Sequence, residues 1–243
     1  MRAVVPLVML LCGVDAAAAQ YALSPLPPLS PSACQVQLAK LASFKPLPAI
    51  AGSGDCVAAD VVLLQSIRLA DQAKLAIVPP ATLRCTMAQE VARWVRDDVA
   101  PALQVLAGAA SYRLDELDSY DCRTQNHIAG ARVSEHGRAN ALDVRDFRLA
   151  NGKVLALTDV KVIKAWRDIL RGDACGRFST VLGPGADGYH EEHIHLDLAE
   201  RRGNYKICEW AVREPPAAGL GEPVPLPRPR PPVKVGGGAT TLR

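Results

Sequence analysis

The spacing of apolar residues predicts two helices in the middle of the chain. Thr86 can cap the first helix, and Pro101 is expected to kink or end it. Asp159 can cap the second helix. The apolar positions that form one face of each helix are Met87, Val91, Trp94 and Val95 in the first, and Val162, Ile163, Trp166, Ile169 and Leu170 in the second. Both faces are typical of helices that pack against a core.

Alternating apolar and polar residues predict several short strands. Asn151-Gly152 is a strong hairpin turn between two of them. The predicted strands lie within 111–122, 141–150, 153–157, 178–182 and 193–198. Helices mixed with hairpin-linked strands are typical of an α+β domain. We therefore expect a single α+β domain with an antiparallel sheet flanked by helices.

The two ends of the chain differ from this middle part. Residues 1–20 begin with Arg2, continue as an apolar stretch and finish in small residues, which is typical of a secretory signal peptide. Prolines crowd residues 21–33 and 214–243, which indicates a linker and an extended or disordered tail. These limits leave one folded domain at 34–213, in a protein expected to be periplasmic or secreted. The tail is either a solvated segment or a ligand for a partner that the sequence does not identify.

Composition and charge exclude several classes of protein. The 243 residues are 49% hydrophobic, which excludes a chain that is disordered throughout. The net charge is only +3 and no basic stripe with interleaved aromatic residues is present, so we expect no nucleic-acid partner. No apolar run of about 18 residues follows the predicted signal peptide, so we expect no transmembrane segment in the mature chain.

Six cysteines remain once the predicted signal peptide is removed. An even number in an exported chain predicts three disulfides, although roughly fifteen pairings are possible and the sequence does not choose among them. No Cys-x-x-Cys pair occurs, which argues against a zinc site built from cysteines. The six residues are Cys34, Cys56, Cys85, Cys122, Cys175 and Cys208.

All five histidines lie between His127 and His195, and three of them fall within the segment HEEHIH at 190–195. If this segment is a strand, alternate side chains point to opposite faces. His193, His195 and Asp197 then share one face, while the apolar residues between them face the core. Such a strand concentrates nitrogen and oxygen ligands on one face.

A second polar cluster, SEHGRANALD, occupies residues 134–143. Small residues between His136 and Asp143 allow the chain to turn, so a loop histidine and a strand carboxylate can converge on one ion. Two imidazoles and one carboxylate suit Zn2+, and a catalytic zinc site keeps its fourth position for water. That water can ionise near neutral pH and attack a carbonyl group that the metal polarises. The two clusters together predict a zinc centre.

These two clusters carry a resemblance to known families. SEHGRANALD resembles the S-x-H-x-x-G-x-A-x-D motif of the zinc peptidases grouped with lysostaphin, D-alanyl-D-alanine metallopeptidases and hedgehog proteins. HEEHIHLD is similar to the second motif of that group, closest to the H-x-x-H-x-H form of penicillin-insensitive murein endopeptidases. Together with SYDCR at 119–123 and the cysteine pattern, the motifs resemble the extensin-like protein C-terminal family over about 34–200.

The resemblance implies a fold like that of the hedgehog and D-Ala-D-Ala peptidase domains, and it implies a ligand set. His136, Asp143 and His195 correspond to the zinc ligands. His193 corresponds to the general base beside the metal, and Glu192 is its rival because related enzymes place a glutamate three positions before the last ligand. A base must come within hydrogen-bond reach of the proton that it removes.

The resemblance also implies residues that contact the substrate. Arg123 matches an arginine that binds a terminal carboxylate or polarises the scissile carbonyl, and His190 can stabilise an oxyanion or orient the substrate. Ser134 is expected to stabilise the ligand loop, and Asp197 to orient a ligand histidine. One departure is Ala139, which stands where the family motif has glycine. If that position needs a positive φ, Ala139 strains the loop.

The predicted function is that of a zinc-dependent peptidase, of the D-Ala-D-Ala carboxypeptidase or murein endopeptidase type. The substrate expected from the resemblance and from export is peptidoglycan, cut in its stem peptides or cross-links. The alternatives are a non-catalytic zinc-containing module of the same fold that binds the cell wall or a protein, and a disulfide-linked structural domain without metal.

Overall fold

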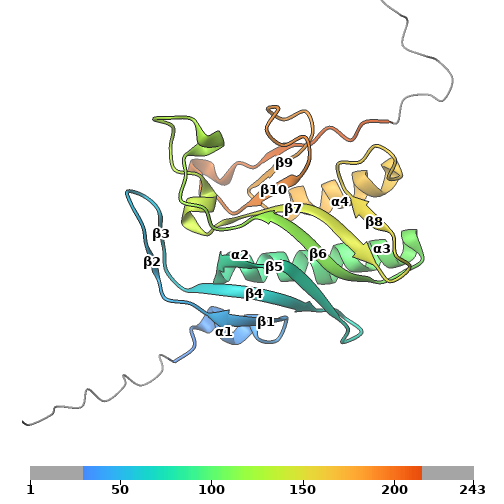
Figure 1. Cartoon of the computed structure of the whole chain (residues 1–243), viewed down its shortest axis with the longest axis horizontal. Coiled ribbons are helices and arrows are strands. Elements are labelled where there is room, and N and C mark those ends of the chain that lie inside the picture. Colours follow the sequence, from blue (N-terminus) through green and yellow to red (C-terminus); the bar gives the residue numbers. More distant parts are fainter. Residues whose placement is uncertain (1–29, 215–243) are drawn as a thin grey trace, which may run out of the picture. The chain divides into compact units, whose positions relative to one another are not determined.

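The computed structural model of this protein describes residues 30–214, and all of the helices and strands described here lie between Ala33 and Glu209 (Figure 1). The predicted signal peptide at 1–20 lies outside the described residues, as do 21–29 of the predicted linker and 215–243 of the predicted tail. Within the described part, no helix combines the length and the apolar character needed to cross a bilayer.

One large sheet organises the fold, and nine strands form it among the described residues. In spatial order they are β1 (Ala42–Pro46), β4 (Val61–Arg68), β5 (Lys74–Arg84), β6 (Ser111–Asp118), β7 (Ala141–Leu149), β10 (Ile194–Asp197), β9 (Thr180–Leu182) and β11 (Ile207–Glu209), with β8 (Val154–Ala156) paired to β7. A separate small hairpin consists of β2 (Ile50–Ala51) and β3 (Val57–Ala58). The expected α+β architecture is confirmed.

The prediction of an antiparallel sheet is wrong for two of the strand pairs. β5 runs parallel to β6, and β11 runs parallel to β9. The first exception arises because a long helical segment connects β5 to β6 and returns the chain to the same end of the sheet, which is how parallel neighbours are joined. The sheet is therefore mixed, although the pairs that carry the histidine segment are antiparallel.

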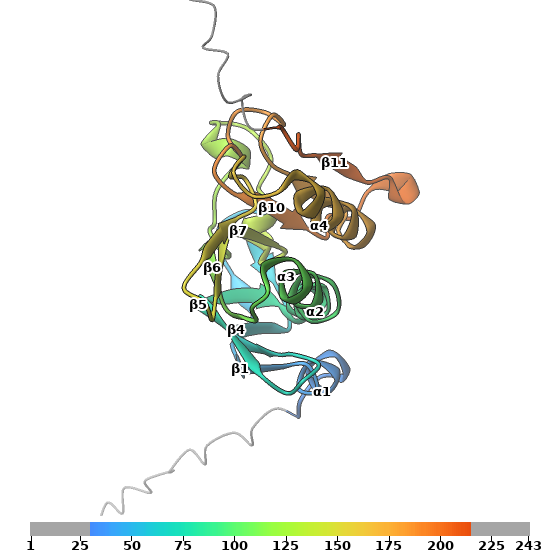
Figure 2. The same cartoon turned by 90° about the vertical axis from the view of Figure 1, so that its right-hand side faces the viewer.

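The helices lie along one face of the sheet, as the view in Figure 2 shows. They are α1 (Ala33–Leu38), α2 (Cys85–Arg93), a π-helix (Trp94–Val99), α3 (Ala100–Ala107) and α4 (Lys164–Arg177). Short 3-10 helices occur at Gln125–His127, Glu135–Arg138 and Arg202–Asn204. The helices bury one side of the strands and leave the other side for polar residues.

The first predicted helix has the expected apolar face but different ends. The four apolar residues that predicted this helix are fully buried, namely Met87, Val91, Trp94 and Val95. Thr86 is not the cap: the helix begins at Cys85, whose N–H donates to the carbonyl of Asp60. Pro101 does not end the helix either, because a π-helical turn precedes it and Pro101 then lies in the first turn of α3, where its missing N–H is tolerated.

The second predicted helix also begins later than expected. Asp159 does not cap it, since the Oδ1 atom of Asp159 accepts a hydrogen bond at 2.8 Å from the N–H of Lys161 in a turn, and the helix begins at Lys164. All five predicted strands are present in shortened form, and the hairpin at Asn151-Gly152 joins β7 to β8. The other strands, β1 to β5 and β11, were not predicted.

The core lies between the sheet and the helices. The β7 and β10 residues that belong to it include Leu142, Val144, Phe147, Leu149, Ile194 and Leu196, all with no exposed surface. On the helical side, the ring of Trp94 packs edge-on against Phe147 and Phe178, with ring centroids 6.2 and 5.9 Å apart. Because side chains alternate along a strand, Asp143 and His195 point to the opposite face.

The three predicted disulfides are present: Cys34–Cys85, Cys56–Cys122 and Cys175–Cys208. They close loops of 51, 66 and 33 residues, and each bond of this kind typically adds about 2–4 kcal/mol to the free energy of unfolding. Structural disulfides form and persist in oxidising compartments, so the protein belongs outside the cytosol.

We expect two glycine substitutions to change stability in opposite directions. A Cβ at Gly183 would lie 2.8 Å from both Ile194 Cδ1 and Trp210 Cγ, in a buried region that has no room to move, so Gly183→Ala should lower the free energy of unfolding by about 1–3 kcal/mol. A Cβ at Gly172, inside α4, meets no atom within 4 Å, so Gly172→Ala should raise it by about 0.5–1 kcal/mol. Urea unfolding of oxidised protein measures both, and equal changes would contradict this packing.

Candidate metal centre

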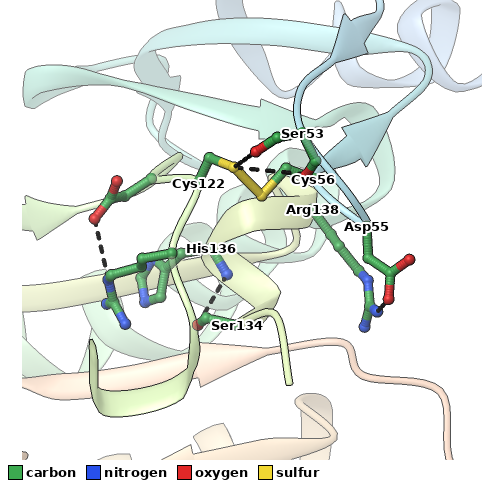
Figure 3. The surroundings of a disulfide bond; sticks show 9 residues. Ser53, Asp55, Cys56, Cys122, Ser134, His136 and Arg138 are labelled. Carbon is green, nitrogen blue, oxygen red and sulfur yellow. Dashed lines mark hydrogen bonds and ion pairs between the residues drawn. A yellow bond between two sulfur atoms is a disulfide. The ribbon is translucent and has the colours of Figure 1, made fainter. Parts of the chain in front are cut away.

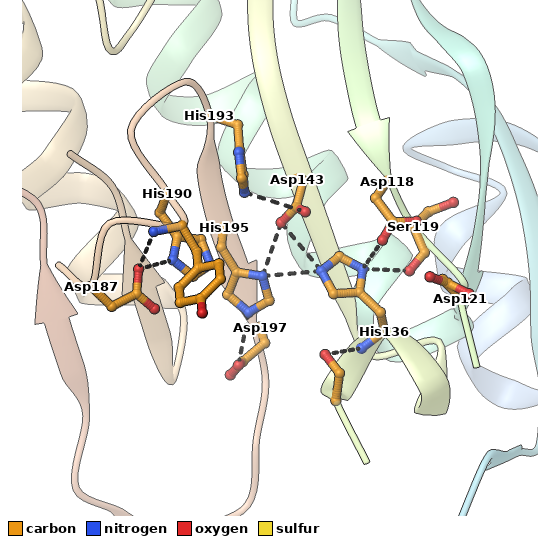
Figure 4. Close-up of polar contacts among 12 residues, drawn as sticks. Asp118, Ser119, Asp121, His136, Asp143, Asp187, His190, His193, His195 and Asp197 are labelled. Carbon is orange, nitrogen blue, oxygen red and sulfur yellow. Dashed lines mark hydrogen bonds and ion pairs between the residues drawn. The ribbon is translucent and has the colours of Figure 1, made fainter. Parts of the chain in front are cut away.

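Two imidazoles and one carboxylate meet on the polar face of the sheet (Figure 4). His195 on β10 pairs directly with Asp143 on β7, and a loop brings His136 to the same point. His195 Nδ1 lies 2.9 Å from Asp143 Oδ1 and 3.1 Å from His136 Nε2, and His136 Nε2 lies 3.2 Å from Asp143 Oδ1. Three potential ligand atoms therefore form a nearly regular triangle inside the protein.

The outer ring nitrogens of both histidines already have acceptors. His136 Nδ1 donates to the carbonyl oxygen of Ser119 at 2.7 Å and lies 3.5 Å from Asp118 Oδ2. His195 Nε2 donates to Asp197 Oδ2 at 3.1 Å. Since a neutral imidazole carries only one proton, both inner nitrogens then present lone pairs toward Asp143. Such a set of facing acceptors requires a positive charge at its centre.

The pKa shifts of Asp143 and His195 also indicate that the cluster favours a positive charge at its centre. Burial opposes charge on Asp143, but hydrogen bonds with His136 and His195 outweigh it and hold the pKa of this carboxyl below its usual range. Burial likewise opposes charge on His195, but its bonds with Asp143 and Asp197 raise the pKa of His195 to about 10. Without a cation, the cluster holds a proton at neutral pH, and a cation bound there would replace that proton.

The geometry and the donor chemistry fit zinc. Four ligands at 2.0–2.2 Å from a tetrahedral zinc ion are separated by about 3.3–3.6 Å from one another. The three atoms of the cluster are separated by 2.9–3.2 Å, so a small outward movement would admit the ion. Imidazole nitrogens together with one carboxylate oxygen also match the ligand preference of zinc.

The loop that carries His136 is held in place by its own sequence and by a disulfide (Figure 3). Ser134 caps the short 3-10 helix, and its hydroxyl accepts a hydrogen bond from the N–H of His136. Gly137 lies against the Cys56–Cys122 disulfide: a Cβ there would be 2.6 Å from Val133 Cγ1 and 3.0 Å from Cys56 Sγ. Only glycine permits this close packing.

Ala139 has φ = 51°, so the position does require the left-handed conformation that the sequence analysis associated with glycine. This conformation costs an alanine about 1–2 kcal/mol. The methyl group of Ala139 is fully buried against Ala58 and Val61, and burial of a methyl group offsets about 0.8 kcal/mol of that strain. The departure from the family motif is therefore compatible with an ordered ligand loop.

The two candidate bases occupy different positions. His193 Nε2 lies 3.4 Å from Asp143 Oδ2, at the edge of the cluster. Burial lowers the pKa of His193; Asp143 opposes this effect and the nearby histidines add to it, so the net shift favours the neutral ring. Glu192 is exposed and is not among the residues that line the cleft. The structure thus brings His193, and not Glu192, to the cluster.

The two predicted substrate-contacting residues both line the cleft. His190 stacks beside His193, with ring centroids 5.1 Å apart. Arg123 is held by two carboxylates, with its guanidinium 3.1 Å from Asp118 Oδ2 and 3.2 Å from Asp121 Oδ2. Much of the charge of Arg123 is therefore balanced, but only the contact with Asp118 is a hydrogen bond, and the Nε atom has no hydrogen-bond partner among the described residues.

The cleft above the cluster has a volume of about 440 Å³, and several of its residues were not expected from the sequence. Among the residues that were missed are Asp118, Asn126, Asp187, Tyr189 and Arg201. Asp118 follows from the pairing of β6 with β7, which places it opposite Asp143, but no local pattern marks it. For Asp187, the sequence gives one indication of a place in the cleft, which is its position three residues before His190.

The fold and the site together define a class of protein: a disulfide-linked α+β domain with a buried His-Asp-His cluster in a surface cleft. The family model described as extensin-like protein C-terminus matches residues 32–209. The chain belongs to this family, as its motifs indicated. No curated protein and no solved structure matches the chain.

A buried carboxyl lies close behind the cluster. Glu116 on β6 is 6% exposed, and its Oε2 atom has no hydrogen-bond partner among the described residues. Burial, together with the negative charges of Asp118 and Asp143, raises the pKa of Glu116 to about 7. The folded protein therefore holds a proton on Glu116 over a pH range in which the unfolded chain does not.

We expect Glu116→Gln to raise the free energy of unfolding at pH 8 by about 1–2 kcal/mol and to change it little at pH 5. The stability linked to a raised pKa is fully present below the unfolded value of 4.5 and is lost as the pH rises through about 7. Urea unfolding at both pH values, in a chelator, measures the effect. Exposed Glu209→Gln serves as the control, and a Glu116→Gln gain at pH 5 equal to that at pH 8 would contradict the shift.

Proposed function

We propose that this protein is an exported, zinc-dependent peptidase that hydrolyses peptide bonds in peptidoglycan stem peptides or cross-links. The observation that carries the proposal is the convergence of His136, Asp143 and His195, with both outer ring nitrogens next to acceptors and both inner ring nitrogens facing the carboxylate. The cluster opens into a cleft that is large enough for a peptide segment.

The residues around the cluster support hydrolysis. Zinc supplies Lewis acidity at a substrate carbonyl and makes a water acidic enough to ionise near neutral pH. His193 is neutral there and lies at the edge of the cluster, so it is available to accept a proton. Arg123, hydrogen-bonded to Asp118 and ion-paired with Asp121, orients the substrate through the guanidinium donors that these carboxylates leave free.

The substrate and compartment rest on separate arguments. Three disulfides indicate an oxidising compartment, either the periplasm or the medium, where peptidoglycan is accessible. The motifs SEHGRANALD and HEEHIHLD resemble those of zinc peptidases that act on peptidoglycan, and they lie on the residues that meet in the cleft. On this basis we propose that the domain shares its fold with the hedgehog and D-Ala-D-Ala peptidase group.

We expect the purified chain to contain about one zinc ion, because the cluster offers three ligands and one open position. His136→Ala and His195→Ala each remove a ligand and should abolish zinc retention. His193→Ala should keep the zinc, since His193 lies outside the triangle of ligand atoms. Elemental analysis after dialysis measures this, with His127→Ala in the same cleft as the matched control. Loss of zinc in His193→Ala would identify His193 as a ligand instead.

The decisive test of the function is release of soluble peptides from purified sacculi. We expect release by the zinc-loaded protein, no release in chelator, and recovery when zinc is restored. His193→Ala should retain zinc and lose about 10²–10⁴-fold of the rate, the usual contribution of a general base. Wild-type protein that binds zinc and sacculi without releasing peptides would instead identify a non-catalytic binding module.

A further inference from the structure

The loop between β9 and β10 carries a carboxylate–imidazole pair next to the candidate metal centre (Figure 4). His190 Nδ1 lies 2.7 Å from Asp187 Oδ1, three residues earlier in the same loop. His190 is buried, with 8% of its surface exposed, while the carboxylate of Asp187 is partly exposed. A short hydrogen bond between a buried ring and an ionised acceptor fixes the ring orientation.

Asp187 is itself held from two sides. Its Oδ1 atom accepts a hydrogen bond at 2.9 Å from the N–H of Tyr189. Its Oδ2 atom accepts a hydrogen bond at 3.3 Å from the side-chain amide of Asn126, which belongs to the loop after Arg123. With both oxygens occupied as acceptors, Asp187 can bind His190 only by accepting, so the Nδ1 atom of His190 carries the proton.

The other ring nitrogen of His190 is left for a ligand. The ring packs against His193 and His195, with centroids 5.1 and 5.6 Å away. His190 Nε2 has no hydrogen-bond partner within residues 30–214 and is not among the fully enclosed, unpartnered atoms. Since His190 also lines the cleft, this nitrogen is accessible from the space above the metal-ligand cluster.

We propose that Asp187 is a positioning residue that holds His190 in one tautomer and presents its Nε2 atom to the substrate. His190 is then the catalytic contact, and Asp187 acts through it without touching the substrate. Asn126 completes the arrangement by coupling the loop after β6 to the loop before β10. The role in turnover rests on the proposed peptidase function, but the positioning of the ring does not.

The positioning is tested by long-range proton–nitrogen NMR of the histidine rings in the full chain. We expect the neutral ring of wild-type His190 to show a protonated Nδ1 and an unprotonated Nε2. Asp187→Ala should lose this preference, because Nδ1 then has no fixed acceptor. Asp187→Asn should keep part of it, since one acceptor oxygen remains. Assignment comes from the signal that disappears in His190→Gln.

Asp159→Ala is a matched control for Asp187→Ala. Asp159 forms the same kind of turn, accepting from the N–H two residues later, but it lies outside the cleft. It should leave the His190 ring signals and turnover unchanged. A His190 ring whose tautomer is the same in wild type and in Asp187→Ala would overturn the positioning role.

Kinetics on a soluble muropeptide separate this role from a merely structural one. We expect zinc-loaded Asp187→Ala to lose about 10- to 100-fold in kcat, the usual effect of removing an orienting partner, with KM nearly unchanged and zinc content equal to wild type. Unchanged kcat would overturn the catalytic part of the proposal. An inactive wild type would overturn the peptidase function alone, and the NMR comparison would still decide whether Asp187 positions His190.

Discussion

The register between β7 and β10 is the constraint on which the site depends. In this register Asp143 faces His195, and their neighbours Leu142, Val144, Ile194 and Leu196 point into the core. A slip of β10 by one residue would turn His195 toward the apolar core and Ile194 and Leu196 toward the polar face, and each of those two apolar side chains contributes about 1.5–3 kcal/mol when it packs in the core. The hydrophobic core therefore selects the pairing that places a carboxylate beside an imidazole.

A second constraint completes the cluster from outside the sheet. His136 belongs to a short loop and reaches Asp143 only because the chain turns sharply through Gly137 and Ala139. The loop is anchored at three points: the Ser134 cap, the disulfide behind Gly137, and the bond from the His136 ring to the carbonyl of Ser119. Each anchor acts on a different atom, so the ring has little freedom to turn away from the sheet.

Much of this arrangement was predictable where the pattern is local. Alternation in the segment 193–198 placed His195 and Asp197 on one face, and the family motifs identified His136 and Asp143. Residues whose place in the cleft depends on contacts between distant segments were not predictable. No local pattern distinguishes Asp118 and Asp187 from other aspartates, and only the positions of β6 and of the loop before β10 place them in the cleft. The ends of the first predicted helix were also not predictable from the sequence. It begins at Cys85 because the N–H of Cys85 donates to the carbonyl of Asp60, and it does not end at Pro101 because a π-helical turn precedes that residue.

The Cys56–Cys122 bond has a consequence for how the site is held. It joins the segment after β2 to the residue just before Arg123, and it supplies the surface on which Gly137 rests (Figure 3). Without this link the loop that carries His136 would lose one of its three anchors, while the Ser134 cap and the bond to the Ser119 carbonyl remain. The position of His136 is therefore coupled, through the packing of Gly137, to a covalent bond between two residues that lie outside the cluster itself.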